Sequence, residues 1–257
     1  MFKQVCLLTR KPGMSMDAFK DYYEQRHAPL LAPMMPLALR YVRRFVQPEI
    51  HPFSNEPMKV PFDCLMELWW KDRVEFEQAM AALGEGDNFQ RIYEDEENIF
   101  ASHDNPGFSV EEFESPMQGF EEVPALGGRR QADGRNGVLK LVFLMKRKTG
   151  MRLAEFRDYY ENKHRKLGEK ALPNALRYVR RYVEPEKNPI TGEAIPLPFD
   201  AILEIWMNSR AEWDATQAGL AGSEIMQAIY EDEEKLFASH DNPMFTVEEA
   251  DSPMRGW

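Results

Sequence analysis

Two acidic residues, Asp63 and Glu67, occur within a short segment that is otherwise apolar and aromatic. Residues 62–70 read Phe-Asp-Cys-Leu-Met-Glu-Leu-Trp-Trp, and a similar pattern recurs later in the chain. In a β-strand, alternate side chains share a face, which places both carboxylates together. That face holds Asp63, Leu65, Glu67 and Trp69, with Asp200, Ile202, Glu204 and Trp206 as counterparts. Buried carboxylates have raised pKa values suited to proton transfer, unless a cation lies nearby.

A second strand-like segment supplies candidate cations and hydroxyl groups. Residues 39–44 read Leu-Arg-Tyr-Val-Arg-Arg, and residues 176–181 repeat them. Arg43 and Arg180 are the expected partners of the carboxylates, while Tyr41 and Tyr178, on the same strand face, are expected to orient a substrate oxygen. The alternative is an internal network of arginines and carboxylates that only holds two sheets together.

Two histidines occur in an identical run, Phe-Ala-Ser-His-Asp-Asn-Pro, as His103 and His240. The Asn-Pro pair predicts a turn after an apolar helix, so each imidazole could act as a general base in a loop, with Asp104 or Asp241 as its orienting partner. The adjacent Ser, His and Asp cannot converge as a hydrolase triad. The alternative role is capping of the helix C-terminus by the imidazole.

A second pair of histidines, His27 and His164, follows a tyrosine by four residues on the apolar face of a predicted helix. Such a histidine is either a buried structural group bonded to the backbone or a carboxylate, or a substrate contact at a helix end. No His-x-x-x-His or Cys-x-x-Cys spacing occurs, so we expect no metal site. Phosphate loops and dinucleotide fingerprints are also absent, and we expect no cofactor.

These residues recur because the chain is duplicated. Residues 39–44 match residues 176–181, and Ile-Tyr-Glu-Asp-Glu-Glu at 92–97 matches 229–234, both at an offset of 137 residues. Copy 1 is predicted to span 1–120 and copy 2 to span 138–257. The polar, glycine-rich residues 121–137 between them are typical of a flexible linker. Two copies favour a fused pseudo-dimer.

Each copy has the pattern of an α+β unit. Residues 3–9 predict a buried strand, a helix follows with Ser15 as its N-cap, and residues 39–46 and 62–70 predict an antiparallel pair. A second helical region, interrupted by glycines at 84 and 86, precedes a last strand near 108–113. The resulting β-α-β-β-α-β order is that of ferredoxin-like folds. Two such sheets packed face to face would form an eight-stranded barrel around the carboxylates.

Composition limits the functions available to this chain. The 257 residues carry a formal net charge of −11, which repels nucleic acid. The acidic run at 93–97 is interpreted as a solvated helix face. We find no membrane span and no secretory signal, and we expect a cytoplasmic protein that contacts neither nucleic acid nor membrane.

The order of these motifs is similar to that of a known family. Phe-x-x-Tyr-Tyr-x-x-x-His at 19–27, Leu-Arg-Tyr-Val at 39–42 and Phe-Asp-x-x-x-Glu-x-Trp at 62–69 resemble the EthD family of dimeric α+β barrels, twice over. The resemblance implies ferredoxin-like units that pair into a barrel with a hydrophobic cavity. It also implies relatives that act without cofactors on aromatic or polyketide compounds, or that have auxiliary roles. The family-like positions are His27, His164, Asp63, Asp200, Glu67 and Glu204.

Our leading hypothesis is a cofactor-independent lyase or isomerase acting on an aromatic or hydrophobic small molecule in a catabolic or secondary-metabolite pathway. The expected proton-transfer residues are His103, His240, Asp63, Asp200, Glu67 and Glu204. The expected substrate contacts are Tyr41, Tyr178, Arg43, Arg180, Trp69, Trp206, His27 and His164. The alternatives are a non-enzymatic binding protein for hydrophobic ligands and a cofactor-free monooxygenase. The copies could pair within one chain, or the protein could form a homodimer.

Overall fold

The structure is a computed structural model that describes residues 1–50, 55–117, 138–187, 193–252 and 254–255. The predicted linker, 121–137, lies outside the described residues. None of the helices in the described ranges is long and apolar enough to cross a membrane.

Both copies have the β-α-β-β-α-β order predicted from the sequence. The elements of copy 1 are β1 (Phe2–Leu8), α1 (Met16–Tyr22), a π-helical turn (Tyr23–His27), α2 (Ala28–Leu31), a 3₁₀ turn (Ala32–Met34), β2 (Arg40–Pro48), β3 (Cys64–Trp70), α3 (Arg73–Leu83), α4 (Asn88–Ile99) and β4 (Gly107–Ser115). The elements of copy 2 are β5 (Leu139–Met145), α5 (Leu153–Tyr159), a π-helical turn (Tyr160–His164), α6 (Arg165–Ala171), β6 (Arg177–Pro185), β7 (Ala201–Met207), α7 (Arg210–Leu220), α8 (Glu224–Leu236) and β8 (Met244–Ser252). Ser15 caps α1 as predicted, since its Oγ accepts a hydrogen bond from the Ala18 amide.

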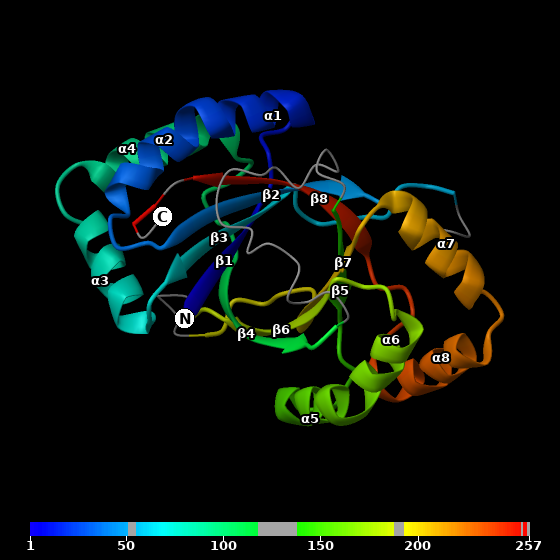
Figure 1. Ribbon diagram of the computed structural model, residues 1–257. Coiled ribbons are helices and arrows are strands. Elements are labelled where there is room, and N and C mark those ends of the chain that lie inside the picture. Colours follow the sequence, from blue (N-terminus) through cyan, green and yellow to red (C-terminus); the bar gives the residue numbers. More distant parts are fainter. Residues whose placement is uncertain (51–54, 118–137, 188–192, 253, 256–257) are drawn as a thin grey trace.

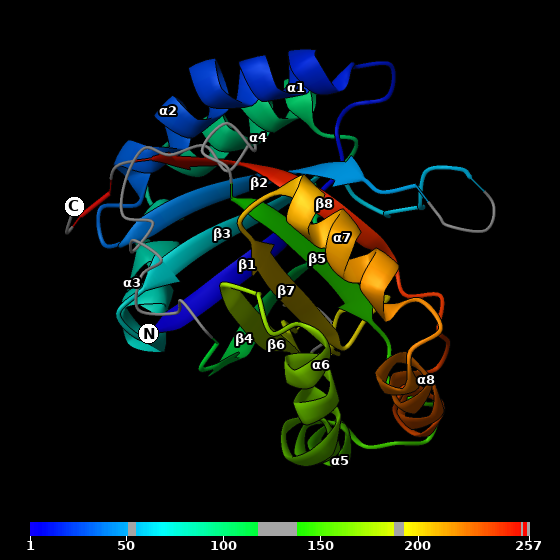
Figure 2. The ribbon, with the colours of Figure 1, turned by 45° about the vertical axis from the view of Figure 1, so that its right-hand side comes forward.

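The eight strands form one closed barrel, in the order β1-β3-β2-β8-β5-β7-β6-β4. Each copy contributes a four-stranded sheet, and the sheets join where β2 pairs with β8 and β4 pairs with β6, all antiparallel. The two copies therefore close on each other within a single chain. Their helices cover opposite sides of the barrel, with α1, α2 and α4 on one side and α5 to α8 on the other (Figures 1 and 2).

Side-chain alternation along the strands creates two kinds of interior. Along β1 the residues that face the barrel axis are Lys3, Val5 and Leu7, so the barrel changes from charged at one end to apolar at the other. The opposite face of β3, with Cys64, Met66 and Leu68, packs against the helices of copy 1, as predicted. Each helix layer and its sheet thus enclose a hydrophobic core separate from the barrel interior.

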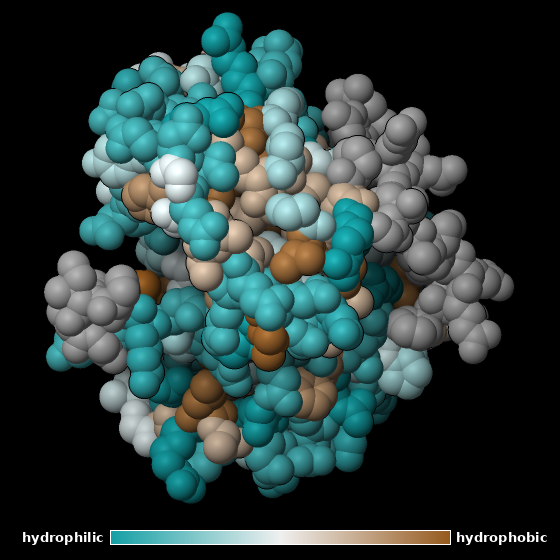
Figure 3. All heavy atoms as spheres, turned by 90° about the vertical axis from the view of Figure 1, so that its left-hand side faces the viewer, coloured by the Kyte–Doolittle hydropathy of each residue, from teal (hydrophilic) through white to brown (hydrophobic). Residues whose placement is uncertain are grey.

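The face of the molecule over the helices of copy 1 is mostly hydrophilic, with small groups of apolar residues among the polar ones (Figure 3). This agrees with the net charge of −11.

Candidate functional site

The carboxylates inside the barrel are saturated by arginine. Arg44 lies 2.5 Å from Glu67, 2.6 Å from Glu204 and 3.0 Å from Glu249. Arg181 makes the symmetry-related contacts, at 2.8 Å to Glu67 and 2.6 Å to Glu204. Glu67 and Glu204 are both only 1% exposed. The network thus joins the two sheets across the barrel axis, which is the alternative role that the sequence left open.

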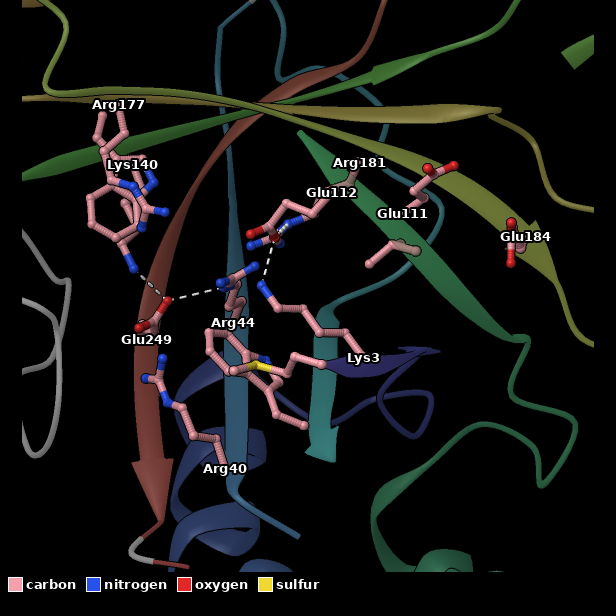
Figure 4. Close-up of a pocket in the computed structure, with 14 residues that line it drawn as sticks. Lys3, Arg40, Arg44, Glu111, Glu112, Lys140, Arg177, Arg181, Glu184 and Glu249 are labelled. Carbon is pink, nitrogen blue, oxygen red and sulfur yellow. Dashed lines mark hydrogen bonds and ion pairs between the residues drawn. The ribbon is translucent and has the colours of Figure 1, made fainter. Parts of the chain in front are cut away.

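Lysines and tryptophans complete the network at the barrel end. Glu249 lies between Lys140 and Arg44 (Figure 4), with a distance of 2.6 Å to the Lys140 Nζ. The Nζ of Lys3 also lies 4.0 Å from the ring centre of Trp69, whose indole N–H donates to Glu67 at 2.9 Å. A cavity of about 650 Å³ opens above these groups. Trp69 and Trp206 are therefore part of the barrel wall, as their predicted face requires.

Charge pairing makes Glu249, Glu112 and Glu204 poor proton donors or acceptors near neutral pH. Burial alone would raise the pKa of Glu249, but Lys140 and Arg44 outweigh it and lower the pKa to about 2. Burial likewise opposes Arg181 and Lys3 at Glu112, where the two cations again prevail and lower the pKa to about 2. The pKa of Glu204 is also lowered, by Arg181 and Arg44 acting against burial. The geometry thus favours a structural role for the barrel network.

Asp63 and Asp200 lie apart from this network, before β3 and β7. The Asp63 carboxylate accepts the Arg10 amide at 2.9 Å. Asp200 accepts the Arg147 amide at 3.1 Å and its guanidinium at 2.6 Å. Asp63 therefore links the residues after β1 to the start of β3, and Asp200 links the residues after β5 to the start of β7.

The predicted face of Arg43 and Arg180 is wrong. Arg43 points to the helix layer, where its Nε lies 2.9 Å from Glu24 and its Nη1 lies 2.7 Å from the Tyr41 carbonyl. Arg180 makes the equivalent contacts. The cations of the barrel are instead Arg44 and Arg181. Two consecutive arginines place one guanidinium on each face of the strand, so alternation alone could not identify the inward one.

A cavity of about 550 Å³ lies between the helices of copy 2 and the outer face of its sheet. Its apolar wall includes Phe143, Leu172, Leu203, Ile205, Trp213, Leu220, Met226, Ile229 and Phe237. The polar side chains at its wall include His164, Tyr160, Tyr178 and His240, and the charged ones include Glu49, Arg210, Asp214 and Glu233. Largely apolar cavities of this size with a few convergent polar groups are typical of small-molecule sites.

His164 is fixed in the wall of this cavity by a carboxylate from α8. Its Nδ1 lies 3.0 Å from Asp232, which also accepts the Tyr159 hydroxyl at 2.6 Å. Burial would raise the pKa of Asp232, but the hydrogen bonds from Tyr159 and His164 outweigh it and lower the pKa. An ionised Asp232 therefore holds the proton on Nδ1 and leaves Nε2 as the basic atom of the ring.

Two tyrosine hydroxyls lie beside this histidine. The ring centre of Tyr160 is 4.9 Å from that of His164, and its hydroxyl is 3.2 Å from that of Tyr178. Burial raises the pKa of Tyr178 to about 12 and that of Tyr160 well above its ordinary range. Both hydroxyls therefore remain protonated and can donate hydrogen bonds.

His103 and His240 line the helix–sheet cavities of copies 1 and 2, rather than the barrel cavity. The Nδ1 of His240 lies 2.8 Å from Glu233, and that of His103 lies 3.0 Å from Glu96. The carboxylate at Nδ1 thus comes from the preceding helix, and the expected pairing with Asp104 or Asp241 is replaced. Since His240 is the more exposed, with 42% of its side chain accessible, it stands at the cavity mouth.

The sequence interpretation missed the carboxylates that hold the buried histidines. His27 Nδ1 lies 2.8 Å from Asp95, the counterpart of the contact between His164 and Asp232. Asp95 belongs to the acidic run at 93–97 that was interpreted as solvated, and Asp232 belongs to its repeat in copy 2. A signal was present, because Asp95 follows Ile92 by three residues and precedes Ile99 by four, and both isoleucines are buried. Helical spacing therefore places Asp95 on the buried face of α4.

The duplicated sheets closed into a barrel define a dimeric α+β barrel made from one chain. A model of the EthD domain matches residues 11–103 and residues 148–240, once in each copy, so the chain belongs to the EthD domain family, as its motifs predicted. No curated protein matches the chain.

Solved structures with this fold are only distantly related in sequence. An anthrone oxidase-like protein is 12% identical, with a TM-score of 0.59, over 98% of this chain and 92% of that one. A putative monooxygenase from Lactobacillus acidophilus is 10% identical, with a TM-score of 0.49, over 98% of this chain and 95% of that one. A chlorite dismutase from Candidatus Nitrospira defluvii is 10% identical, with a TM-score of 0.40, over 96% of this chain and 90% of that one. At 12% identity, the likeness to the anthrone oxidase-like protein concerns the fold alone.

Proposed function

We propose that this protein binds an aromatic small molecule in the helix–sheet cavity of copy 2 and transfers a proton on it, as a cofactor-independent isomerase or lyase. The observation that carries the proposal is the position of His164. It is a buried imidazole, 5% exposed, oriented by an ionised carboxylate, in the wall of a cavity that is otherwise mostly apolar. A base held in this way, away from competing water, suits the removal of a weakly acidic proton.

The neighbouring groups suit a carbon acid next to a carbonyl. His164 Nε2 would take the proton from carbon, the electron pair of the C–H bond would form a carbon–carbon double bond, and the π pair of the carbonyl would move onto its oxygen. The Tyr178 hydroxyl, protonated because its pKa is about 12, would donate to the developing oxyanion. Delivery of the proton to the oxygen or to a different carbon completes an isomerisation, and departure of a group from the β-carbon with its bonding electron pair, as the carbonyl re-forms, completes a lyase reaction. His240 at the cavity mouth would exchange the proton with solvent.

The wall composition supports an aromatic ligand. Phe143, Trp213 and Phe237 contribute ring surfaces to the cavity, and flat apolar molecules bury the most surface against such walls. A protein similar in fold is described as anthrone oxidase-like. Anthrone, a flat ketone with an acidic methylene group between two rings, is therefore a suitable probe for this cavity.

The test is exchange of the anthrone methylene protons for deuterium without oxygen, followed by NMR. The protein is expected to accelerate exchange, and His164→Ala is expected to reduce the acceleration about 10²-fold or more. His27→Ala, which removes the equivalent histidine of copy 1, is the matched control, and this variant is expected to accelerate exchange as much as the wild-type protein does. Equal acceleration by wild-type protein and His164→Ala would refute the proposed base.

Two further outcomes separate the alternative functions. Binding of anthrone without any accelerated exchange would indicate a binding protein rather than an enzyme. Oxygen uptake that depends on His164, when air is admitted, would indicate that the same proton removal serves a cofactor-free oxygenase.

A further inference from the structure

The two helix–sheet cavities are unequal, although the copies correspond residue by residue. The cavity in copy 1 has a volume of about 240 Å³, against about 550 Å³ in copy 2. Position 31 of copy 1 corresponds to position 168 of copy 2, at the offset of 137 residues that relates all the repeated motifs. Leu31 lines the smaller cavity and Gly168 lines the larger one.

Gly168 permits a close approach between α6 and the sheet. A Cβ atom added at this position would lie only 2.5 Å from the hydroxyl oxygen of Tyr178. Such a distance is not compatible with ordinary packing, so any larger residue here must displace this tyrosine. In copy 1, Leu31 carries a side chain at the corresponding position, while the tyrosine pair itself is kept, with Tyr41 and Tyr23 hydroxyls 3.0 Å apart and Tyr178 and Tyr160 hydroxyls 3.2 Å apart. Gly168 therefore sets both the space in copy 2 and the position of its hydroxyl donor.

Copy 1 supplies part of the wall of the copy 2 cavity. Glu49, Ile50 and Met58, from the connection between β2 and β3, line this cavity. The Glu49 carboxylate forms an ion pair with Arg210 on α7 of copy 2, with an Nη1–Oε2 distance of 3.1 Å. The Met58 sulfur accepts the Met244 amide at 3.1 Å. Contacts with copy 2 thus fasten Glu49 and Met58; we call Glu49, Ile50 and Met58 the copy 1 lip.

The reciprocal arrangement differs. The described residues that line the smaller cavity all belong to copy 1. Arg73, the counterpart of Arg210, lies 3.9 Å from Glu186, a longer contact than the one that fastens the copy 1 lip. Copy 2 therefore completes its cavity with help from copy 1, whereas none of its described residues lines the cavity of copy 1.

We infer that each chain holds one ligand, in the composite cavity of copy 2, and that Gly168 determines the size of this cavity and the position of the ligand in it. The inference rests on the proposed function. The ligand class is a flat molecule of two or more fused rings with a carbonyl or hydroxyl oxygen directed at Tyr178. Copy 1 acts as a structural partner that closes the barrel and supplies the copy 1 lip.

Calorimetric titration of the full-length chain with 2-naphthol tests the inference. Wild-type protein is expected to bind one equivalent. Gly168→Leu, which gives copy 2 the residue of copy 1, is expected to weaken binding at least about tenfold. Leu31→Gly, the reciprocal change, is expected to keep the first site and to add a second, weaker one. Two equivalents bound by the wild type, or unchanged affinity in Gly168→Leu, would overturn the inference.

A second pair of variants covers the case in which Gly168→Leu does not fold. Arg210→Gln releases the copy 1 lip and is expected to weaken 2-naphthol binding severalfold, while Arg73→Gln is expected to leave it unchanged. Equal affinity in both variants would contradict a composite wall. Binding of one equivalent without proton exchange on anthrone would remove the proposed reaction and keep this inference, whereas absence of any binding would remove both.

Discussion

Replacing Glu249 by glutamine tests the role of the barrel network. Pairing with Lys140 and Arg44 lowers the pKa of Glu249 from its ordinary value of 4.5 to about 2. At 1.36 kcal/mol for each pKa unit, this difference corresponds to about 3 kcal/mol of folding free energy at neutral pH. Loss of one partner from a buried ion pair costs a similar amount. Glu249→Gln should therefore reduce the free energy of unfolding by about 3 kcal/mol at pH 7.

The effect should depend on pH in a defined direction. Because the folded-state pKa lies below the ordinary value, the stabilisation is fully present above about pH 5 and is lost as the pH falls towards 2. Urea unfolding followed by circular dichroism at pH 7 and pH 3 measures the difference. Glu248→Gln is the matched control, since Glu248 pairs with Lys20 in a partly exposed position and should contribute less than about 1 kcal/mol. A Glu249→Gln variant within 1 kcal/mol of wild type at pH 7, or one whose deficit is the same at both pH values, would refute the reasoning.

Three other predictions concern the cavity and the thiols. Asp232→Asn should reduce deuterium exchange on anthrone about 10²-fold, because the amide no longer fixes the basic Nε2 of His164, whereas Asp95→Asn should not; equal rates in both variants would contradict this. Tyr178→Phe should lower the same rate about 10²-fold with little change in calorimetric affinity for anthrone, and an unchanged rate would exclude the hydroxyl as oxyanion donor. Burial raises the pKa of Cys6 to about 12, so at pH 8 about 10⁻⁴ of this thiol is ionised. Alkylation of Cys6 by iodoacetamide, read by mass spectrometry, should therefore be slow in native protein and fast in urea. Rapid labelling of the native protein would contradict the raised pKa.

Much of the fold could be predicted from the sequence because the duplication repeats each local signal. A constant offset of 137 residues showed that both copies have the same elements in the same order. Closure within one chain could not be predicted. It depends on the pairing of β2 with β8 and of β4 with β6, and a strand edge carries the same backbone groups whether its partner belongs to the same chain or to another.

The candidate site was predicted only in part. Strand alternation does not show which charged groups pair, and the sequence does not show where a cavity remains after packing. Alternation placed Glu67 and Glu204 inside the barrel correctly, but it could not show that Arg44 would saturate them. The cavity beside His164 could not be predicted, because the sequence does not show whether space remains next to a buried histidine. That space depends on Gly168, and the approach of Tyr178 to this glycine is visible only once the helix is packed on the sheet.

A crystal structure of the full chain with bound anthrone tests the central claim most directly. We expect one molecule per chain, between α6, α8 and the outer face of β6 and β7, with its oxygen at the Tyr178 hydroxyl and its methylene carbon at His164. Anthrone bound instead at the charged end of the barrel, or equally in both helix–sheet cavities, would contradict the account.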